Sequence, residues 1–186
     1  MSGNKLLRTR VKYEKYFLEK YFSGETFPIL RMKNGDAIFE RDVKTSNGNI
    51  YRLRSYVGEN YPDILPKLVV CCSPKPMPKW QGSHETHTYQ PKDGLLQICF
   101  FRPKRWTREN RLYEVFNKGE EWLEAYEQHL VTGVKMCELL PEMEPSEEEI
   151  AEEFIQAMAM MSEVFMQVFL NNFITNQEAL TYSDEI

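Results

Sequence analysis

Cys99 is the residue of this sequence whose type and surroundings best suit covalent chemistry. It lies between the apolar residues 95–98 and the pair Phe100-Phe101, at the end of a stretch rich in proline and glycine. The apolar neighbours anchor its backbone, while the end of a loop lets its side chain reach solvent. A thiolate in such a position is a strong nucleophile. We therefore predict that Cys99 is a catalytic nucleophile.

Several basic residues come shortly after Cys99 in the sequence, and their positive charge would favour the thiolate form of Cys99 over the thiol. A helix predicted to start near Thr107 would add its N-terminal dipole if it pointed at the sulfur. The alternative is that Cys99 is a small buried hydrophobe and that the basic residues are the solvated start of a helix. The basic residues are Arg102, Lys104, Arg105, Arg108 and Arg111.

The other three cysteines have weaker settings. Cys71 and Cys72 end an apolar run and are expected to pack, and Cys137 follows the turn at Thr132-Gly133 and is expected to be inert. The four cysteines show no CxxC pair and no Cys/His ligand spacing, so we predict neither a metal site nor a cofactor.

The elements that must position Cys99 can be read from periodicity and turn residues. Apolar residues at helical spacing predict a helix over 5–22, which ends before Gly24. Turn signals at Asn34-Gly35 and Asn47-Gly48 separate strand-like runs. The predicted strands are 29–32, 37–44, 50–57 and 68–72.

After these strands the periodicity changes. Residues 73–97 carry many prolines and glycines and are predicted to be a long, functional loop. A helix is predicted over 107–130. Ser146 and Glu149 form a capping-box signal for a last, Met-rich helix that runs to about Ile174.

Strands grouped before helices predict an α+β fold. We expect a domain over residues 1–140, followed over 141–186 by an acidic linker, a long apolar helix and a polar tail. Glu163 and Gln167 near the middle of that helix argue against a membrane span. The helix is expected to pack along the domain, or to bind a partner or a second copy of the chain.

Composition limits the class of protein. Hydrophobic residues make up 42% of 186 residues, which is enough for a core, and the net charge of −5 argues against a nucleic-acid binder. The first residues hold no apolar run of signal-peptide length, so we expect a cytoplasmic protein with reduced thiols.

A proline-stiffened segment precedes the fourth strand, and its place in the chain resembles a known family. Ubiquitin-conjugating enzymes have an N-terminal helix, a four-stranded antiparallel meander and a YPxxxP turn. Next comes a loop with a His-Pro-Asn triplet. It is followed by a glycine, the catalytic cysteine, a tryptophan and the C-terminal helices. The resemblance covers roughly residues 5–135. The matching residues are Tyr61, Pro62, Pro66, His87, Gly94, Cys99 and Trp106.

Residues 121–133, EWLEAYEQHLVTG, resemble the WLxxYExxLxTG pattern of bacterial ubiquitin-conjugating-like proteins. Those proteins occur in antiphage islands, notably cyclic-oligonucleotide-based signalling systems (CBASS), or in bacterial ubiquitin-like operons. The resemblance implies that Cys99 carries a protein C-terminus as a thioester and passes it to a target amine. The donor would be a signalling nucleotidyltransferase or a ubiquitin-like protein, with an activating enzyme as a further partner.

The chain departs from the family at the triplet, which is His87-Thr88-Tyr89, without the asparagine. An oxyanion needs a preorganised donor. The hydroxyl of Tyr89 or Thr88, the Gln97 amide or a backbone N–H could replace it. His87 or Asp93 could manage the proton of the attacking amine, although His87 could equally be a structural loop residue. The predicted catalytic set is Cys99, His87 and Tyr89.

Two basic surfaces are candidates for partner binding, each with a solvated helix surface as the alternative. Arg102, Lys104, Arg105 and Trp106 could receive an acidic surface of the donor. The first helix corresponds to the face that the family presents to its activating enzyme. Its basic residues are Lys5, Arg8, Arg10, Lys12 and Lys15.

Two other functions compete with the conjugating enzyme. Inactive relatives of the family are protein-binding modules, and the missing asparagine favours that reading while Cys99 argues against it. A cysteine hydrolase using Cys99 and His87 lacks a third, orienting residue.

Overall fold

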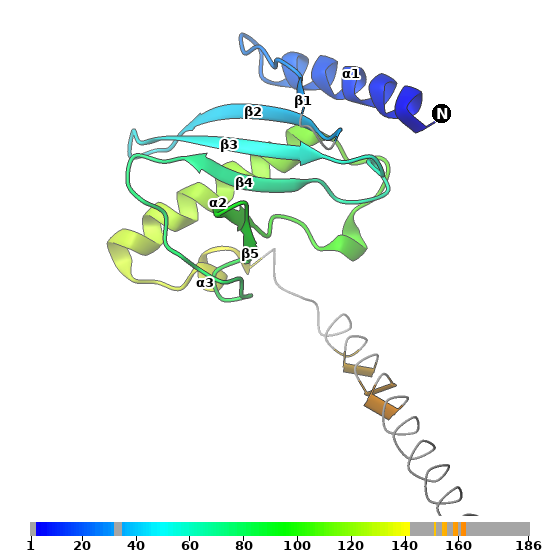
Figure 1. Ribbon diagram of the computed structural model, residues 1–186. Coiled ribbons are helices and arrows are strands. Elements are labelled where there is room, and N and C mark those ends of the chain that lie inside the picture. Colours follow the sequence, from blue (N-terminus) through cyan, green and yellow to red (C-terminus); the bar gives the residue numbers. More distant parts are fainter. Residues whose placement is uncertain are drawn as a thin grey trace, which may run out of the picture. The chain divides into compact units, whose positions relative to one another are not determined.

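The computed structural model describes residues 3–31 and 35–141, together with positions 151, 154–155, 158–159 and 161–162. Helix α1 precedes an antiparallel sheet, and helices α2 and α3 follow it, so the predicted α+β class is confirmed (Figure 1). The helices are α1 Gly3–Tyr21, the 3-10 helix η1 Pro103–Arg105, α2 Leu112–Thr132 and α3 Met136–Leu139. The strands are β1 Leu30–Arg31, β2 Ala37–Lys44, β3 Ile50–Val57, β4 Lys67–Cys72, β5 Thr88–Lys92 and β6 Leu95–Ile98.

The sheet has six antiparallel strands in the order β1-β2-β3-β4-β6-β5. Strands β2 and β3 have the predicted bounds, because the Asn47-Gly48 turn between them is a local signal. The predicted long loop is wrong over its second half, where β5 and β6 form a hairpin. Its turn, Asp93-Gly94, has φ values of 52° and 76°, as a two-residue hairpin turn requires. Pro91 obscured this hairpin, although an edge strand such as β5 tolerates proline.

Helix α2 begins at Leu112 and not at Thr107 as predicted. The Asn110 side chain accepts the backbone N–H of Thr107 at 2.8 Å and holds a turn there. The Glu114 side chain accepts the Arg111 N–H at 3.1 Å and caps the true start of the helix. The helical pattern in the sequence therefore begins before the helix itself, in the loop that precedes the cap at Arg111.

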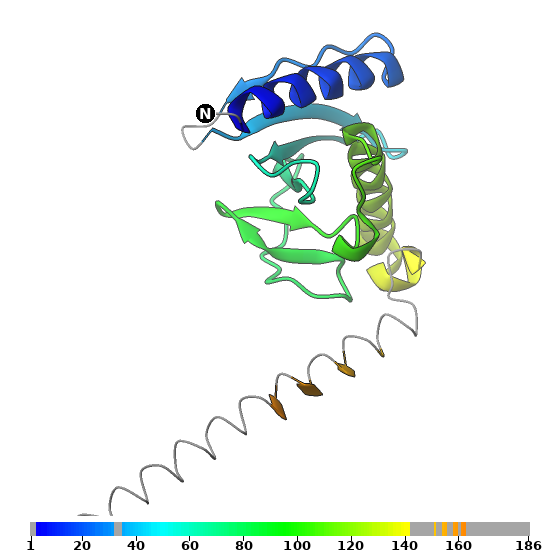
Figure 2. The ribbon, with the colours of Figure 1, turned by 90° about the vertical axis from the view of Figure 1, so that its right-hand side faces the viewer.

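Helix α2 crosses one face of the sheet and forms the main core with it (Figure 2). Gly119 allows the close approach, since a Cβ there would lie 2.6 Å from Leu53 and 2.7 Å from Leu68. The opposite face carries a smaller apolar cluster of Ile38, Tyr56 and Val69. We call this second face the outer face of the sheet.

A buried carboxylate ties α1 to the start of α2. Glu14 is fully buried, and one of its oxygens pairs with Arg10 at 2.9 Å. The other accepts the Leu112 N–H at 3.0 Å. Arg10 also donates to the carbonyls of Arg108 and Asn110, so the helix predicted to face an activating enzyme uses Arg10 internally.

The chain divides into two compact units, Met1–Glu144 and Pro145–Ile186. In the second unit the described positions are helical, and they include Phe154, Ile155, Met158 and Met161. The predicted capping residues Ser146 and Glu149 lie outside the described residues, as do Glu163, Gln167 and the predicted helix end near Ile174. Within the described part of the chain, no helix is both long and apolar enough to span a bilayer.

Candidate functional site around Cys99

Cys99 follows directly on strand β6 and is half-buried. Its backbone N–H donates to the His87 carbonyl at 2.9 Å, which holds it beside the loop that leads into β5. Side chains alternate along a strand. Since Leu96 and Ile98 face the main core, Gln97 and Cys99 point toward the outer face. The thiol therefore opens away from α2.

The phenol of Tyr89 reaches the Cys99 thiol from the neighbouring strand. Tyr89 lies opposite Gln97 in the β5–β6 pairing, and its hydroxyl forms a side-chain hydrogen bond with Cys99. The same hydroxyl donates to the Phe101 carbonyl at 3.4 Å. The structure thus brings together the predicted nucleophile and one of the groups predicted to replace the missing asparagine.

The pKa of the Cys99 thiol is raised overall, although the basic neighbour Arg102 acts in the predicted direction. Burial raises the pKa of Cys99, while the Tyr89 hydrogen bond and the charge of Arg102 lower it without offsetting the burial. Burial also raises the pKa of Tyr89, and the neighbouring Cys99 raises it further. Both groups therefore hold their protons near neutral pH.

The remaining basic residues act elsewhere. Lys104 and Arg105 are exposed on or next to the 3-10 turn, and Arg108 pairs with Asp63. Arg111 donates to the Arg108 carbonyl at 3.0 Å. The predicted dipole contribution is also absent from this site. Helix α2 starts well after Cys99, and the carboxylates of Glu14 and Glu114 take up N–H groups at its start.

His87 serves the site through its backbone. Its φ of 47° is unusual for a residue with a Cβ, and the residue as a whole is only 2% exposed. The carbonyl that accepts the Cys99 N–H depends on this backbone conformation. An imidazole so deeply buried is not presented to an incoming amine, so the structure favours the structural alternative for His87.

The structure argues against the roles predicted for Trp106 and Asp93. Trp106 is 8% exposed and donates to the Pro62 carbonyl at 2.7 Å, while its ring packs edge-on against Phe101. It therefore locks the Tyr-Pro turn to the segment after Cys99 and is not part of a partner surface. Asp93 lies in the hairpin turn before β6, whereas Cys99 follows the other end of that strand. Asp93 cannot take a proton directly at the thiol.

Sequence reasoning missed the residues that cover strand β5. Ser83 exchanges two backbone hydrogen bonds with Thr88, at 3.0 and 3.2 Å. Gly82 packs so closely that a Cβ would lie 2.7 Å from the Tyr89 carbonyl carbon. Trp122, from the motif at 121–133, donates to the Thr86 carbonyl at 3.1 Å and anchors the same loop. Gly82, shortly before the turn that leads into β5, was a local signal in the sequence for this close packing.

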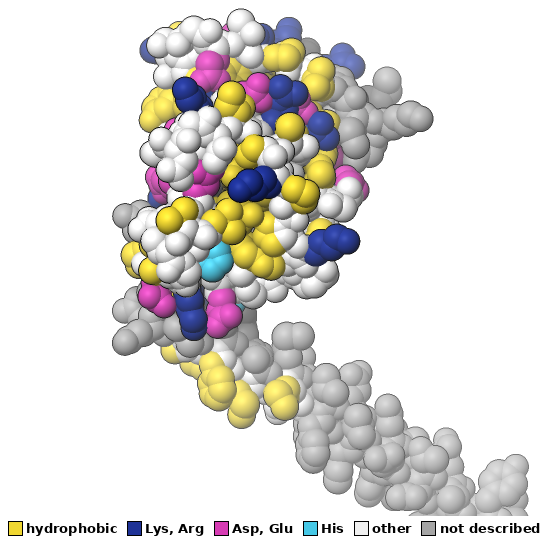
Figure 3. All heavy atoms as spheres, turned by 90° about the vertical axis from the view of Figure 1, so that its left-hand side faces the viewer, with side chains coloured by type: hydrophobic (Ala, Val, Ile, Leu, Met, Phe, Trp, Pro, Cys, Tyr) yellow, Lys and Arg dark blue, Asp and Glu magenta, His cyan; other side chains and the backbone are white. Residues whose placement is uncertain are grey.

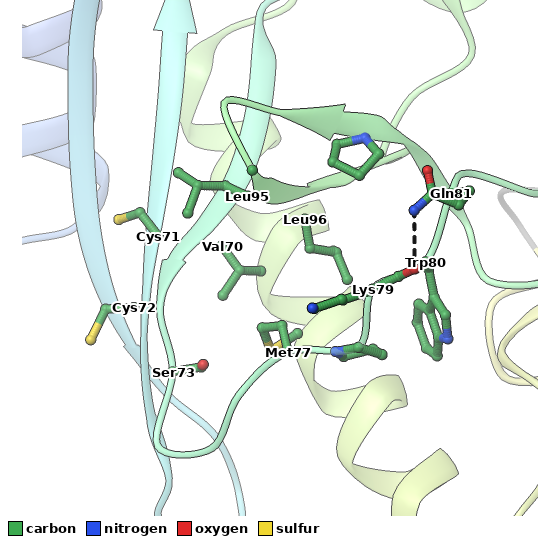
Figure 4. A pocket seen from close by; sticks show the side chains of 13 residues that line it. Val70, Cys71, Cys72, Ser73, Met77, Lys79, Trp80, Gln81, Leu95 and Leu96 are labelled. Atoms are coloured by element: carbon green, nitrogen blue, oxygen red, sulfur yellow. Dashed lines mark hydrogen bonds between the residues drawn. The ribbon is translucent and has the colours of Figure 1, made fainter.

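A separate hollow of about 650 Å³ lies between the end of β4 and residues 77–81 (Figure 4). Met77, Trp80 and Leu96 line it, and Cys99 is not among its lining residues. Hydrophobic side chains gather on this end of the first unit (Figure 3).

All four cysteines are free thiols, and their settings differ. Cys71 is half-buried and its thiol donates to the Arg52 carbonyl at 3.4 Å, whereas Cys72 is exposed, contrary to the prediction that it packs. Cys137 is half-buried. The described residues contain no group of three His, Cys, Asp or Glu side chains that could hold a metal ion.

Comparisons with protein-family models, with curated proteins and with solved structures give no match to this chain. The geometry around Cys99 is therefore the basis for a functional assignment.

Proposed function

We propose that this protein is a ubiquitin-conjugating-like acyltransferase that carries the C-terminus of a donor protein as a thioester on Cys99. The observation that carries the proposal is the thiol itself. Cys99 is held by the His87 carbonyl, opens toward the outer face and has the Tyr89 hydroxyl beside its sulfur. The α+β order, with a helix before the antiparallel sheet and helices after it, supports the proposal, while the β5–β6 hairpin comes in addition to the four predicted strands.

The reaction has two acyl transfers. The Cys99 thiolate attacks the activated carbonyl of the donor, an oxyanion forms, and the leaving group departs with its electron pair. A target amine then attacks the thioester, loses a proton, and expels the Cys99 thiolate as the amide forms. The donor is a signalling nucleotidyltransferase or a ubiquitin-like protein, activated by a separate enzyme, in the cytoplasm during bacterial antiphage defence.

The exposed basic residues after Cys99 suit the acidic surface of such a donor. Lys104 and Arg105 are exposed and Arg102 is half-buried, so this short segment offers positive charge a few residues after Cys99. The apolar C-terminal helix that the sequence predicts remains a candidate for joining two copies of the chain.

A second function is favoured by one specific observation. Burial raises the pKa of Cys99, which reduces the thiolate available near neutral pH. A catalytically weak member of the same fold would then act as a protein-binding module, recognising the donor without carrying it.

The deciding experiment mixes the full chain with the donor, its activating enzyme and ATP, followed by electrophoresis without reductant. We expect an adduct that thiols remove, that is absent in Cys99→Ala, and that becomes a thiol-resistant ester in Cys99→Ser. Cys72→Ser is the matched control because Cys72 is the exposed cysteine. If the wild type forms no adduct but binds the donor as tightly as Cys99→Ala does, the binding module is correct.

A further inference from the structure

The strand register puts a lysine near Cys99. Strands β4 and β6 pair Val70 with Leu96, Val69 with Gln97 and Leu68 with Ile98. Extended by one position past the end of β6, the same register would set Lys67 opposite Cys99. Residues directly opposite in an antiparallel pair have Cβ atoms about 5 Å apart.

Both side chains point to the same face. Val69 belongs to the outer apolar cluster, so Lys67, two positions earlier on β4, also points outward. Cys99 stands two positions after Gln97 on the same face. An extended lysine side chain is long enough to bring its ammonium group to the space above the sulfur.

A shallow groove of about 510 Å³ contains this lysine. Lys67, Tyr89 and Gln97 line it together, and the Tyr89 hydroxyl contacts the Cys99 thiol. Lys67 is exposed, so its ammonium is available to a ligand in the groove. The groove therefore brings a phenol and a cation together on the face toward which Cys99 points, next to the end of β6 that Cys99 follows.

We propose that the Lys67 ammonium stabilises the oxyanion that forms when Cys99 attacks an acyl donor. This inference rests on the proposed function and assigns a residue to the role left open by the missing asparagine. When the sulfur–carbon bond forms, the carbonyl π electrons move to the oxygen, beside Lys67. When the carbonyl re-forms, the leaving group departs with the electrons of its bond, and Lys67 is unchanged.

Lys92 provides a matched control in the same groove. It also lines the groove and carries the same charge. Its ammonium lies 4.7 Å from the centre of the Tyr56 ring and 3.3 Å from the Asp93 carboxylate, so it is already held by an aromatic ring and a counter-charge. It lies near the end of the hairpin farthest from Cys99.

The test uses two reactions of Cys99 in the full chain, each followed by intact mass and peptide mapping. A short peptide thioester acylates the thiol through a tetrahedral oxyanion, whereas iodoacetamide alkylates it by direct displacement without one. We expect Lys67→Met to slow acylation by about tenfold, less than for a buried oxyanion donor because Lys67 is exposed. Alkylation should be unchanged, Lys67→Arg should restore most of the acylation rate, and Lys92→Met should resemble the wild type.

The other possible results of this test each contradict either the role of Lys67 or the proposed function. Unchanged acylation in Lys67→Met overturns the oxyanion role and leaves the proposed function intact. Equal slowing of both reactions shows that Lys67 acts on the thiol or the fold, and an acyl group mapped to Lys67 shows that it is an acceptor. Either result overturns the inference. If wild-type Cys99 is alkylated but is never acylated, the proposed function itself fails.

Discussion

At the scale of single residues, the Tyr89 hydroxyl affects the ionisation of Cys99. Its hydrogen bond lowers the pKa of the thiol, which burial raises. Loss of the hydroxyl should therefore raise the pKa of Cys99 further and leave less thiolate at neutral pH. We predict that Tyr89→Phe shifts the pH profile of Cys99 alkylation by iodoacetamide to higher pH.

The wild-type profile should already have its midpoint above that of an ordinary cysteine, about 8.5. Tyr16→Phe is the matched control, since Tyr16 is 58% exposed on α1. A profile for Tyr89→Phe that stays in place or moves to lower pH would contradict a role of Tyr89 in thiol ionisation.

At the scale of elements, the fit of residues 82–83 against β5 positions Tyr89. Gly82 has φ of 90° and no room for a Cβ, whereas Gly94 has φ of 76° and nothing within 4 Å of a Cβ. Alanine is strained at both positions, but only at Gly82 does it also collide with the Tyr89 backbone. We predict that Gly82→Ala slows acylation of Cys99 more than Gly94→Ala does.

The comparison separates backbone strain from displacement of Tyr89. Thermal unfolding of both variants shows how much of each effect is loss of stability. If the two variants lose acylation equally at equal stability, the packing of Gly82 against β5 has no special role in the site.

At the scale of the whole first unit, Glu14 is the buried charged residue through which α1 contacts the start of α2. Its removal leaves Arg10, whose side chain is 23% exposed, and the Leu112 N–H without their carboxylate. We predict that Glu14→Ala lowers the free energy of unfolding by about 3 kcal/mol, as measured in urea. Glu121→Ala removes only a surface pair with Lys118 and should change it by less than about 1 kcal/mol. Equal losses in the two variants would contradict this.

A second carboxylate links the β2–β3 turn to α2 and makes stability depend on pH. Burial raises the pKa of Glu127, but hydrogen bonds outweigh it, including those from Asn47 at 2.7 Å and Asn49 at 2.8 Å, and the net pKa is lowered. A carboxyl group whose pKa is lower in the folded state than in the unfolded state stabilises the fold at pH values above its unfolded-state pKa. That contribution to stability is lost as the pH falls through the pKa that the group has in the folded state.

We therefore predict that the wild type loses stability as pH drops below about 4.3, the ordinary value for glutamate. Glu127→Gln should be less stable at pH 7 and should lose less on acidification. Urea unfolding at both pH values measures this, with Glu121→Gln as the exposed control. A Glu127→Gln variant with the full wild-type pH dependence would rule out Glu127 as its source.

Much of the fold was predictable because it depends on local signals. The bounds of β2 and β3 follow from alternation and the Asn47-Gly48 turn. The start of α2 was not predictable in this way, since the helical pattern continues into a loop that Asn110 closes. The β5–β6 hairpin was missed because pairing with β4, and not the composition of a proline-containing strand, stabilises it.

The sequence by itself determined the chemistry available, a thiol at Cys99 with a phenol at Tyr89 and positive charge nearby. Only the tertiary structure decided how each group is used. Burial depends on what packs from elsewhere in the chain, and it raised the pKa of Cys99 and withdrew His87 and Trp106 from solvent. Strand register, which is set by pairing between distant segments, put Lys67 on β4 next to the residue that pairs with Ile98, and therefore near Cys99.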